Sequence, residues 1–213
     1  MTCCTHACCD APFNDKRAAK DLKRYRKQGP DPTTRALIDA LIRAGANAGT
    51  LLDVGGGIGA LHHELLDAGM GSATHADASA PYLRSAREEA ARRGHNERVQ
   101  FIHADFTDVA SDLPPADVVT LDRVVCCYPD FRGLLKAASS RSQRALAMTY
   151  PRDTWFMRMG IAVVNFFQRL RKDPFRVFVH PVREMELLLK GEGLQKVSTR
   201  RLLVWEMALY QRL

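Results

Sequence analysis

The sequence predicts an α/β protein with a parallel, doubly wound sheet. From Thr50 onward, strand-like and helix-like segments alternate at the spacing of βαβ units. An apolar strand at 51–54 leads into a glycine-rich turn at 55–59, and a helix pattern begins at Leu61. The chain has 213 residues, of which 46% are hydrophobic and 26% charged, enough for one well-buried domain and short for two.

Each element follows from local patterns. Residues 15–28 form a basic helix that ends at the breakers of 29–32, and Thr33 can cap a second helix at 34–44. The alternating region predicts strands at 50–54, 72–77, 98–103, 116–122 and 144–150, with helices at 59–68, 79–93 and 130–139. The C-terminal part predicts an aromatic, helix-like insertion at 153–172, a helix at 182–190 and strands near 194–199 and 202–211. The last two strands should pair as an antiparallel hairpin at the sheet edge.

The glycine turn indicates a cofactor. Glycines at 55, 57 and 59 expose backbone N–H groups at a helix start, where a ligand can approach closely. Their spacing also matches the dinucleotide fingerprint, so spacing alone is ambiguous. Asp53 favours another ligand, because a carboxylate there repels a pyrophosphate but suits an ammonium and a sulfonium. S-adenosylmethionine carries both groups, and we expect it as the cofactor.

Polar residues also follow the neighbouring strands, where ligands bind in open α/β sheets. Asp77 ends the second strand, and its carboxylate can accept hydrogen bonds from a ribose diol. Asp105 and Phe106 follow the third strand and can contact the amino group and face of an adenine. Asp122 ends the fourth strand, begins a loop rich in reactive groups, and is expected to contact the cofactor. Asp77 and Asp105 could instead cap the helices that follow them.

These motifs resemble the class I S-adenosylmethionine-dependent methyltransferases over residues 33–213. The resemblance rests on LLDVGGGIG, on Asp77, on ADF at 104–106 and on ADVVTLDRVV at 116–125. It implies a Rossmann-like sheet of seven strands, mostly parallel with an antiparallel strand at the edge, and helices on both faces. It also implies that the glycines line the methionyl part of the cofactor, with Asp77 at the ribose and Asp105-Phe106 at the adenine.

The C-terminal half is similar to the magnesium-protoporphyrin O-methyltransferases. The shared features are Thr149-Tyr150-Pro151, an aromatic insertion, a basic segment and the helix-opening His180. In Cys127-Tyr128-Pro129 a cysteine stands where some family members have histidine. The resemblance implies O-methylation of magnesium-protoporphyrin IX as an alternative to methylation of another small, largely apolar molecule.

A base is needed only for some acceptors, because a carboxylate is already ionised near neutral pH. Four side chains are candidates. His62 shares the predicted inward helix face with Leu61 and Leu65, and His180, Tyr128 and Cys127 follow it in rank. Each could instead have a structural role.

Six cysteines in three adjacent pairs raise a different function. With His6 between the first two pairs, the N-terminus could hold a soft metal, but the spacing matches no zinc pattern, and we expect no metal site. We expect residues 1–14 to be a flexible, Cys-rich tail and 15–213 to be one methyltransferase domain. A thiol or metal sensor on the same scaffold stays an alternative.

The net charge of +7 permits an acidic partner. A nucleic-acid methyltransferase is therefore another alternative, although no interleaved aromatic and basic recognition module is present. The aromatic stretch 153–172 should be a lid over an apolar substrate, a helix on a membrane surface, or ordinary core packing. We expect residues 153–180 as a whole to form a substrate-covering insertion. The chain opens without an apolar signal segment, so we expect a cytoplasmic protein. The acceptor and the oligomeric state are open.

Overall fold

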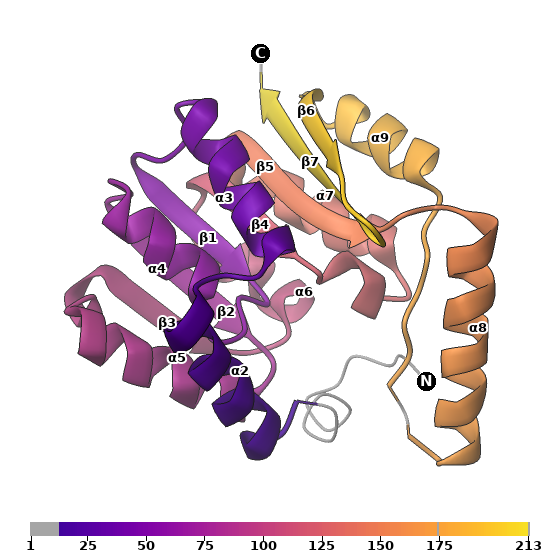
Figure 1. Ribbon diagram of the computed structural model, residues 1–213. Helices are drawn as coiled ribbons and strands as arrows, with labels where there is room; N and C mark the ends of the chain where they lie inside the picture. The colour runs from indigo at the N-terminus through magenta and orange to yellow at the C-terminus, as the bar shows by residue number, and fades with distance from the viewer. Residues whose placement is uncertain (1–12, 174, 213) are drawn as a thin grey trace.

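A computed structural model describes residues 13–173 and 175–212. Its centre is a seven-stranded sheet in the order β3-β2-β1-β4-β5-β7-β6 (Figure 1). The strands are β1 (Thr50–Val54), β2 (Ser72–Asp77), β3 (Val99–His103), β4 (Ala116–Asp122), β5 (Ser142–Pro151), β6 (Leu194–Arg201) and β7 (Trp205–Arg212). The first five are mutually parallel, and β7 pairs antiparallel with both β5 and β6. The predicted seven-stranded, mostly parallel sheet is confirmed, and the closing antiparallel hairpin lies at its edge.

Helices cover both faces of the sheet. They are α2 (Asp15–Gln28), α3 (Pro32–Arg43), α4 (Ala60–Asp67), α5 (Ala80–Arg93), α6 (Phe106–Val109), α7 (Phe131–Arg141), α8 (Trp155–Leu170) and α9 (Val182–Gly191). Strand side chains alternate between two apolar clusters, as the pleat of a β-strand requires. Leu52 and Val54 join the cluster of α7 and α9, whereas Leu51 faces α3 and α4. Asp53 shares the second face, so the only acidic residue of β1 points toward α4 rather than into solvent.

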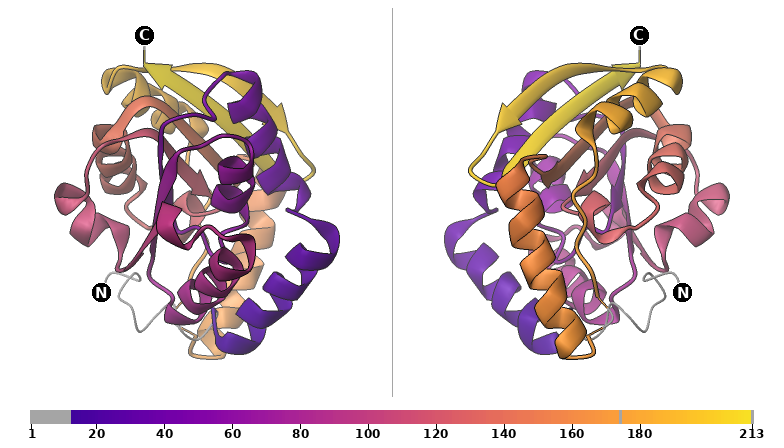
Figure 2. Two further views of the ribbon diagram at one scale, coloured as in Figure 1. Left: turned by 90° about the vertical axis from the view of Figure 1, so that its left-hand side faces the viewer. Right: turned by 90° about the vertical axis from the view of Figure 1, so that its right-hand side faces the viewer.

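Two predicted regions differ in detail. The predicted N-terminal tail lies outside the described residues up to position 12, but its last two residues belong to the folded body. Asn14 caps α2 by accepting from the Arg17 N–H, and the Phe13 ring packs edge-on against Tyr82. The insertion forms α8, which buries none of its residues. Core packing, one of the three interpretations of this insertion, is therefore wrong (Figure 2).

Candidate active site

A cavity of about 510 Å³ lies at the carboxyl ends of β1, β2 and β4. The glycine turn, α2, the loop after β4 and the segment before α9 form its walls. Figure 1 shows α2 and that segment on opposite sides of the strand ends. Cavities of this volume are typical of sites for small molecules and cofactors, and the topological position agrees with the rule for open α/β sheets.

The turn itself requires glycine at the cavity wall. Gly55 and Gly57 have φ angles of +60° and +59°, a left-handed conformation that side chains disfavour. A Cβ at Gly55 would lie 2.6 Å from Cγ2 of Val124, and one at Gly56 would overlap the Asp53 carboxylate. The bare backbone therefore forms a surface that a ligand can approach.

Gly59 serves a different purpose from the other two predicted glycines. It has a φ angle of +82° and precedes α4, but it does not line the cavity. A Cβ at this position would lie 2.5 Å from Cε1 of His62. Gly59 thus leaves room for a buried histidine below the turn.

Asp77 connects the turn to β2. Its Oδ2 accepts a 2.9 Å hydrogen bond from the Gly57 N–H, and its Oδ1 accepts one of 2.8 Å from the Ser79 N–H. The side chain lines the cavity, and Ser79 rather than Asp77 caps α5, so the position of Asp77 fits the predicted ligand contact and not the capping alternative. Each carboxylate oxygen has a second lone pair for a ligand hydroxyl.

Asp53 lies fully buried below Gly56, at the floor of the cavity. Its carboxylate accepts hydrogen bonds from Thr120 Oγ1 at 2.8 Å and from His62 Nδ1 at 3.0 Å. Burial raises the pKa of Asp53 to about 6, because a charge in the protein interior is poorly solvated. A nearby cation would restore the charged form.

This pKa gives a prediction for cofactor affinity. Below about pH 6 the free protein holds a proton on Asp53, and a cationic ligand must displace it to gain the carboxylate charge. Binding of S-adenosylmethionine should therefore weaken by up to about tenfold between pH 7 and pH 5. Asp53→Asn should bind more weakly at neutral pH and lose this dependence. Isothermal titration of both proteins at pH 7 and pH 5 tests this prediction. If the affinity of the variant changed with pH as much as that of the wild type, the prediction would be contradicted.

His62, the first candidate base, does not reach the cavity. Its ring is fully buried and packs against the rings of His63 and His75, with centroids 4.2 and 4.9 Å away. Burial lowers its pKa well below the ordinary value, so the ring is neutral. Among the described residues its Nε2 has no hydrogen-bond partner. His62 therefore orients Asp53 from behind the turn and touches no ligand.

His180 also lies outside the cavity wall. Its Nε2 donates to the backbone carbonyls of Val125 at 3.1 Å and Tyr128 at 2.9 Å, and its ring packs against Phe131 and Phe178. Burial lowers its pKa, which keeps it neutral. His180 fixes the shape of the loop after β4, so the structure contradicts its direct role as a base.

The other two candidates, Tyr128 and Cys127, do line the cavity. The Tyr128 hydroxyl donates a 2.8 Å hydrogen bond to Asp105. The Cys127 thiol lies 3.9 Å from the Cys126 sulfur, and a hydrogen bond with Cys126 together with burial raises the pKa of Cys127 well above its usual range. A thiol in this environment stays protonated at neutral pH and is a poor nucleophile.

Asp105 and Phe106, both predicted to contact the adenine, have different roles. Phe106 lines the cavity with its ring almost fully buried. Asp105 does not line it. Its carboxylate caps α6 through the Thr107 N–H at 3.0 Å and accepts from Tyr128, which is the capping alternative. Asp105 thus positions the cavity wall rather than facing a ligand.

Asp122 lines the cavity as predicted, with partners that the sequence did not suggest. It accepts hydrogen bonds from Thr34 at 2.5 Å and Thr149 at 2.6 Å. The next residue, Arg123, has a φ angle of +61° and forms a 2.8 Å ion pair with Asp31 at the start of α3. Left-handed non-glycine residues are uncommon and concentrate at functional sites. Arg123 and Thr34 both line the cavity.

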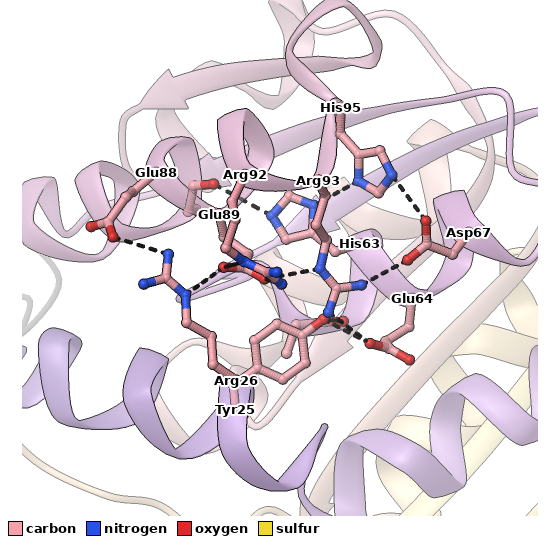
Figure 3. A network of polar contacts seen from close by, with 12 residues as sticks. Tyr25, Arg26, His63, Glu64, Asp67, Glu88, Glu89, Arg92, Arg93 and His95 are labelled. Atoms are coloured by element: carbon pink, nitrogen blue, oxygen red, sulfur yellow. Dashed lines mark hydrogen bonds and ion pairs between the residues drawn. The ribbon is translucent and has the colours of Figure 1, made fainter.

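Helix α2 forms one wall of the cavity. Tyr25 is buried, lines the cavity, and donates a 2.8 Å hydrogen bond to Glu64 of α4. Outside this wall, Glu89 of α5 pairs with three arginines, namely Arg26, Arg92 and Arg93 (Figure 3). Burial alone would raise the pKa of Glu89, but these arginines lower it to about 2. The network holds α2 against α4 and α5.

The insertion reaches the cavity through its second half only. Phe175 and Val177 line it, whereas no residue of α8 does. Trp155, an aromatic residue of the insertion that was expected to cover the substrate, is 73% exposed. Among the described residues no group of histidine, cysteine and acidic side chains could hold a metal ion. The two N-terminal cysteine pairs and His6 lie outside those residues.

Comparisons agree with this geometry. Residues 51–144 match a protein family described as "Methyltransferase domain". No curated protein sequence matches the chain significantly. A solved structure of magnesium protoporphyrin IX methyltransferase from Synechocystis PCC 6803, with bound S-adenosylhomocysteine, is similar at 18% identity and a TM-score of 0.70, covering 94% of this chain and 100% of that one.

Two further solved structures share the fold. A 1,6-didemethyltoxoflavin-N1-methyltransferase from Burkholderia thailandensis is 15% identical, with a TM-score of 0.65 and coverage of 92% of this chain and 87% of that one. A ribosomal protein methylase from Lactobacillus delbrueckii subsp. bulgaricus is 17% identical, with a TM-score of 0.62 and coverage of 86% and 80%. The three proteins differ widely in the acceptors they are named for, so the shared fold leaves the acceptor open.

Proposed function

We propose that this protein, which carries a methyltransferase domain at residues 51–144, transfers a methyl group from S-adenosylmethionine to a small, largely apolar molecule. One observation carries the proposal: a single cavity combines a bare glycine turn, several carboxylates and an apolar wall. Asp53 and Asp77 lie at the turn, and Asp122, Asp21 and Asp31 also line the cavity. No nucleic-acid partner is part of this proposal.

The cofactor end of the cavity suits S-adenosylmethionine better than a dinucleotide. A pyrophosphate at the turn would meet the carboxylates of Asp53 and Asp77, whereas an ammonium and a sulfonium are attracted by them. Asp77 can accept from ribose hydroxyls, and the Phe106 ring offers an apolar face for adenine. When bound, this cofactor supplies an electrophilic methyl group, and the protein contributes orientation and exclusion of water.

The apolar part of the cavity lining suggests the acceptor. Tyr128, Phe175, Val177 and Trp205 provide apolar surface. The Arg123 guanidinium, paired with Asp31 at 2.8 Å, has further N–H donors for an anionic group. Among the described lining residues there is no histidine, and the Cys127 thiol stays protonated. We therefore favour an acceptor atom that is nucleophilic without a strong base, such as a carboxylate oxygen.

O-methylation of magnesium-protoporphyrin IX is the second candidate. The similar fold of the Synechocystis enzyme and the preference for a carboxylate acceptor favour it. A screen that measures release of S-adenosylhomocysteine should include this porphyrin beside apolar carboxylic acids, phenols, amines and thiols. Turnover with an apolar carboxylic acid is expected. Turnover confined to nucleic acid or protein would contradict the proposal.

A substitution in the apolar wall tests the acceptor end. Phe175→Ala should raise the acceptor KM by about tenfold, because it removes a large contact surface, and should lower the affinity for S-adenosylhomocysteine by a smaller factor. Trp155→Ala is the matched control, since that ring lies on α8 outside the cavity. Equal KM values in both variants would exclude the segment before α9 from the acceptor site.

A further inference from the structure

Helix α8 is a large apolar surface with no partner among the described residues. It has eight exposed large apolar side chains: Trp155, Phe156, Met159, Val163, Val164, Phe166, Phe167 and Leu170. Figure 2 (right) shows the helix on the outside of the molecule, in front of the segment that precedes α9. Exposed apolar patches rimmed by polar groups mark interaction sites.

The helical repeat divides α8 into two opposite sides. Met157, Ile161, Asn165 and Gln168 recur at helical spacing, are half-buried and face the protein. Asn165 anchors this side, because its amide exchanges hydrogen bonds of 2.8 and 3.0 Å with the Val177 backbone. The opposite side is a straight apolar stripe at the same spacing: Trp155, Met159, Val163, Phe166 and Leu170.

The charged residues of α8 that border this stripe are all positive. Arg158 and Arg169 are the only charged residues within α8, and the helical repeat places both along one border of the stripe. Arg171 and Lys172 continue the cationic border beyond the helix end, and Arg158 reaches Asp153 at 2.7 Å. A second copy of the chain would bring like charges together, whereas an anionic surface complements them.

We propose that α8 lies on the surface of an anionic membrane, with its apolar stripe among the acyl chains and its arginines at the headgroups. Long basic side chains at the border of an apolar face suit this depth. Among the described residues, no helix is both long and apolar enough to cross a membrane, so α8 would lie along it. Leu203 is 87% exposed and precedes Val204, whose backbone carbonyl accepts a 3.0 Å hydrogen bond from the Arg152 N–H. Arg152 lies three residues before the start of α8.

Vesicle flotation tests the proposal with the full chain. Vesicles of equal parts phosphatidylcholine and phosphatidylglycerol should bind the protein, and pure phosphatidylcholine should bind it much less. Substituting the stripe with Met159→Asp and Phe166→Asp should weaken binding at least about tenfold. Leu187→Asp on α9, also an exposed apolar residue, is the matched control and should bind as wild type. A blue shift of Trp155 fluorescence, absent in Trp155→Phe, should accompany binding.

Each other outcome contradicts membrane binding through α8. Equal flotation of the stripe variant and wild type would show that another surface binds the lipid. Absence of flotation, with sedimentation showing a dimer that the stripe variant loses, would assign α8 to a second copy. If the protein neither floated with vesicles nor formed a dimer, a protein partner would be the remaining occupant of α8. Titration with S-adenosylhomocysteine in the same variants keeps the result separate from the proposed methyl transfer, because α8 does not line the cavity.

Discussion

Replacing Gly57 with valine should abolish binding of S-adenosylmethionine. The backbone at this position has a φ of +59° and its N–H holds Asp77 at 2.9 Å. A Cβ would already lie 3.4 Å from the Tyr82 ring, and the branched valine side chain would fill the cavity beside the turn. We expect affinity for S-adenosylhomocysteine to fall by at least about a hundredfold, measured by isothermal titration.

A matched control separates the filled cavity from backbone strain. Gly94 ends α5 with a φ of +72°, and a Cβ there would meet nothing within 4 Å. Gly94→Val should therefore lower the free energy of unfolding by about 1–2 kcal/mol through the same unfavourable conformation, and keep full affinity. If both variants lost affinity equally, strain alone would explain the effect and the turn would not contact the cofactor.

Asp77→Asn should weaken cofactor binding by about tenfold to a hundredfold. The amide cannot accept from Gly57, Ser79 and ribose hydroxyls together, and it carries no charge. Asp117→Asn is the matched control, because Asp117 also accepts a backbone N–H, from Thr50 at 2.8 Å, and lies outside the cavity lining. Comparable affinity losses in the two variants would indicate a general loss of stability instead of a ribose contact.

The sheet and the cofactor end could be predicted because their signals are local. An apolar run followed by glycines specifies a buried strand and a tight turn whatever surrounds them. The carboxyl ends of parallel strands meet at one edge, so Asp77 and Asp122 were expected to lie together, and both line the cavity.

The catalytic candidates could not be ranked from sequence, because burial and partners decide their chemistry. His62 points below the turn only because Gly59 lacks a side chain. His180 binds backbone carbonyls more than 50 positions earlier in the chain. Asp105 caps α6. An aspartate that caps this helix and one that contacts an adenine would stand at the same position after the strand, so the sequence does not separate the two roles.

The walls of the cavity also depend on contacts between residues that are far apart in the sequence. Tyr25 of α2 meets Glu64 of α4, and Asp31 meets Arg123 after β4. No sequence pattern marks such pairs, although the Asp31-Pro32 cap of α3 was a usable signal for a helix start beside the site. Helix α8 is amphipathic in its pattern, yet only the structure shows that its larger apolar side faces outward.

Binding of cofactors to the purified wild-type protein tests the central claim most directly. Calorimetric titration at neutral pH should show one site for S-adenosylmethionine and one for S-adenosylhomocysteine, and no heat of binding with NAD. The reason is the pair of carboxylates at the glycine turn, Asp53 and Asp77, which attracts a sulfonium and an ammonium and repels a pyrophosphate. Binding of NAD without binding of S-adenosylmethionine would contradict the account.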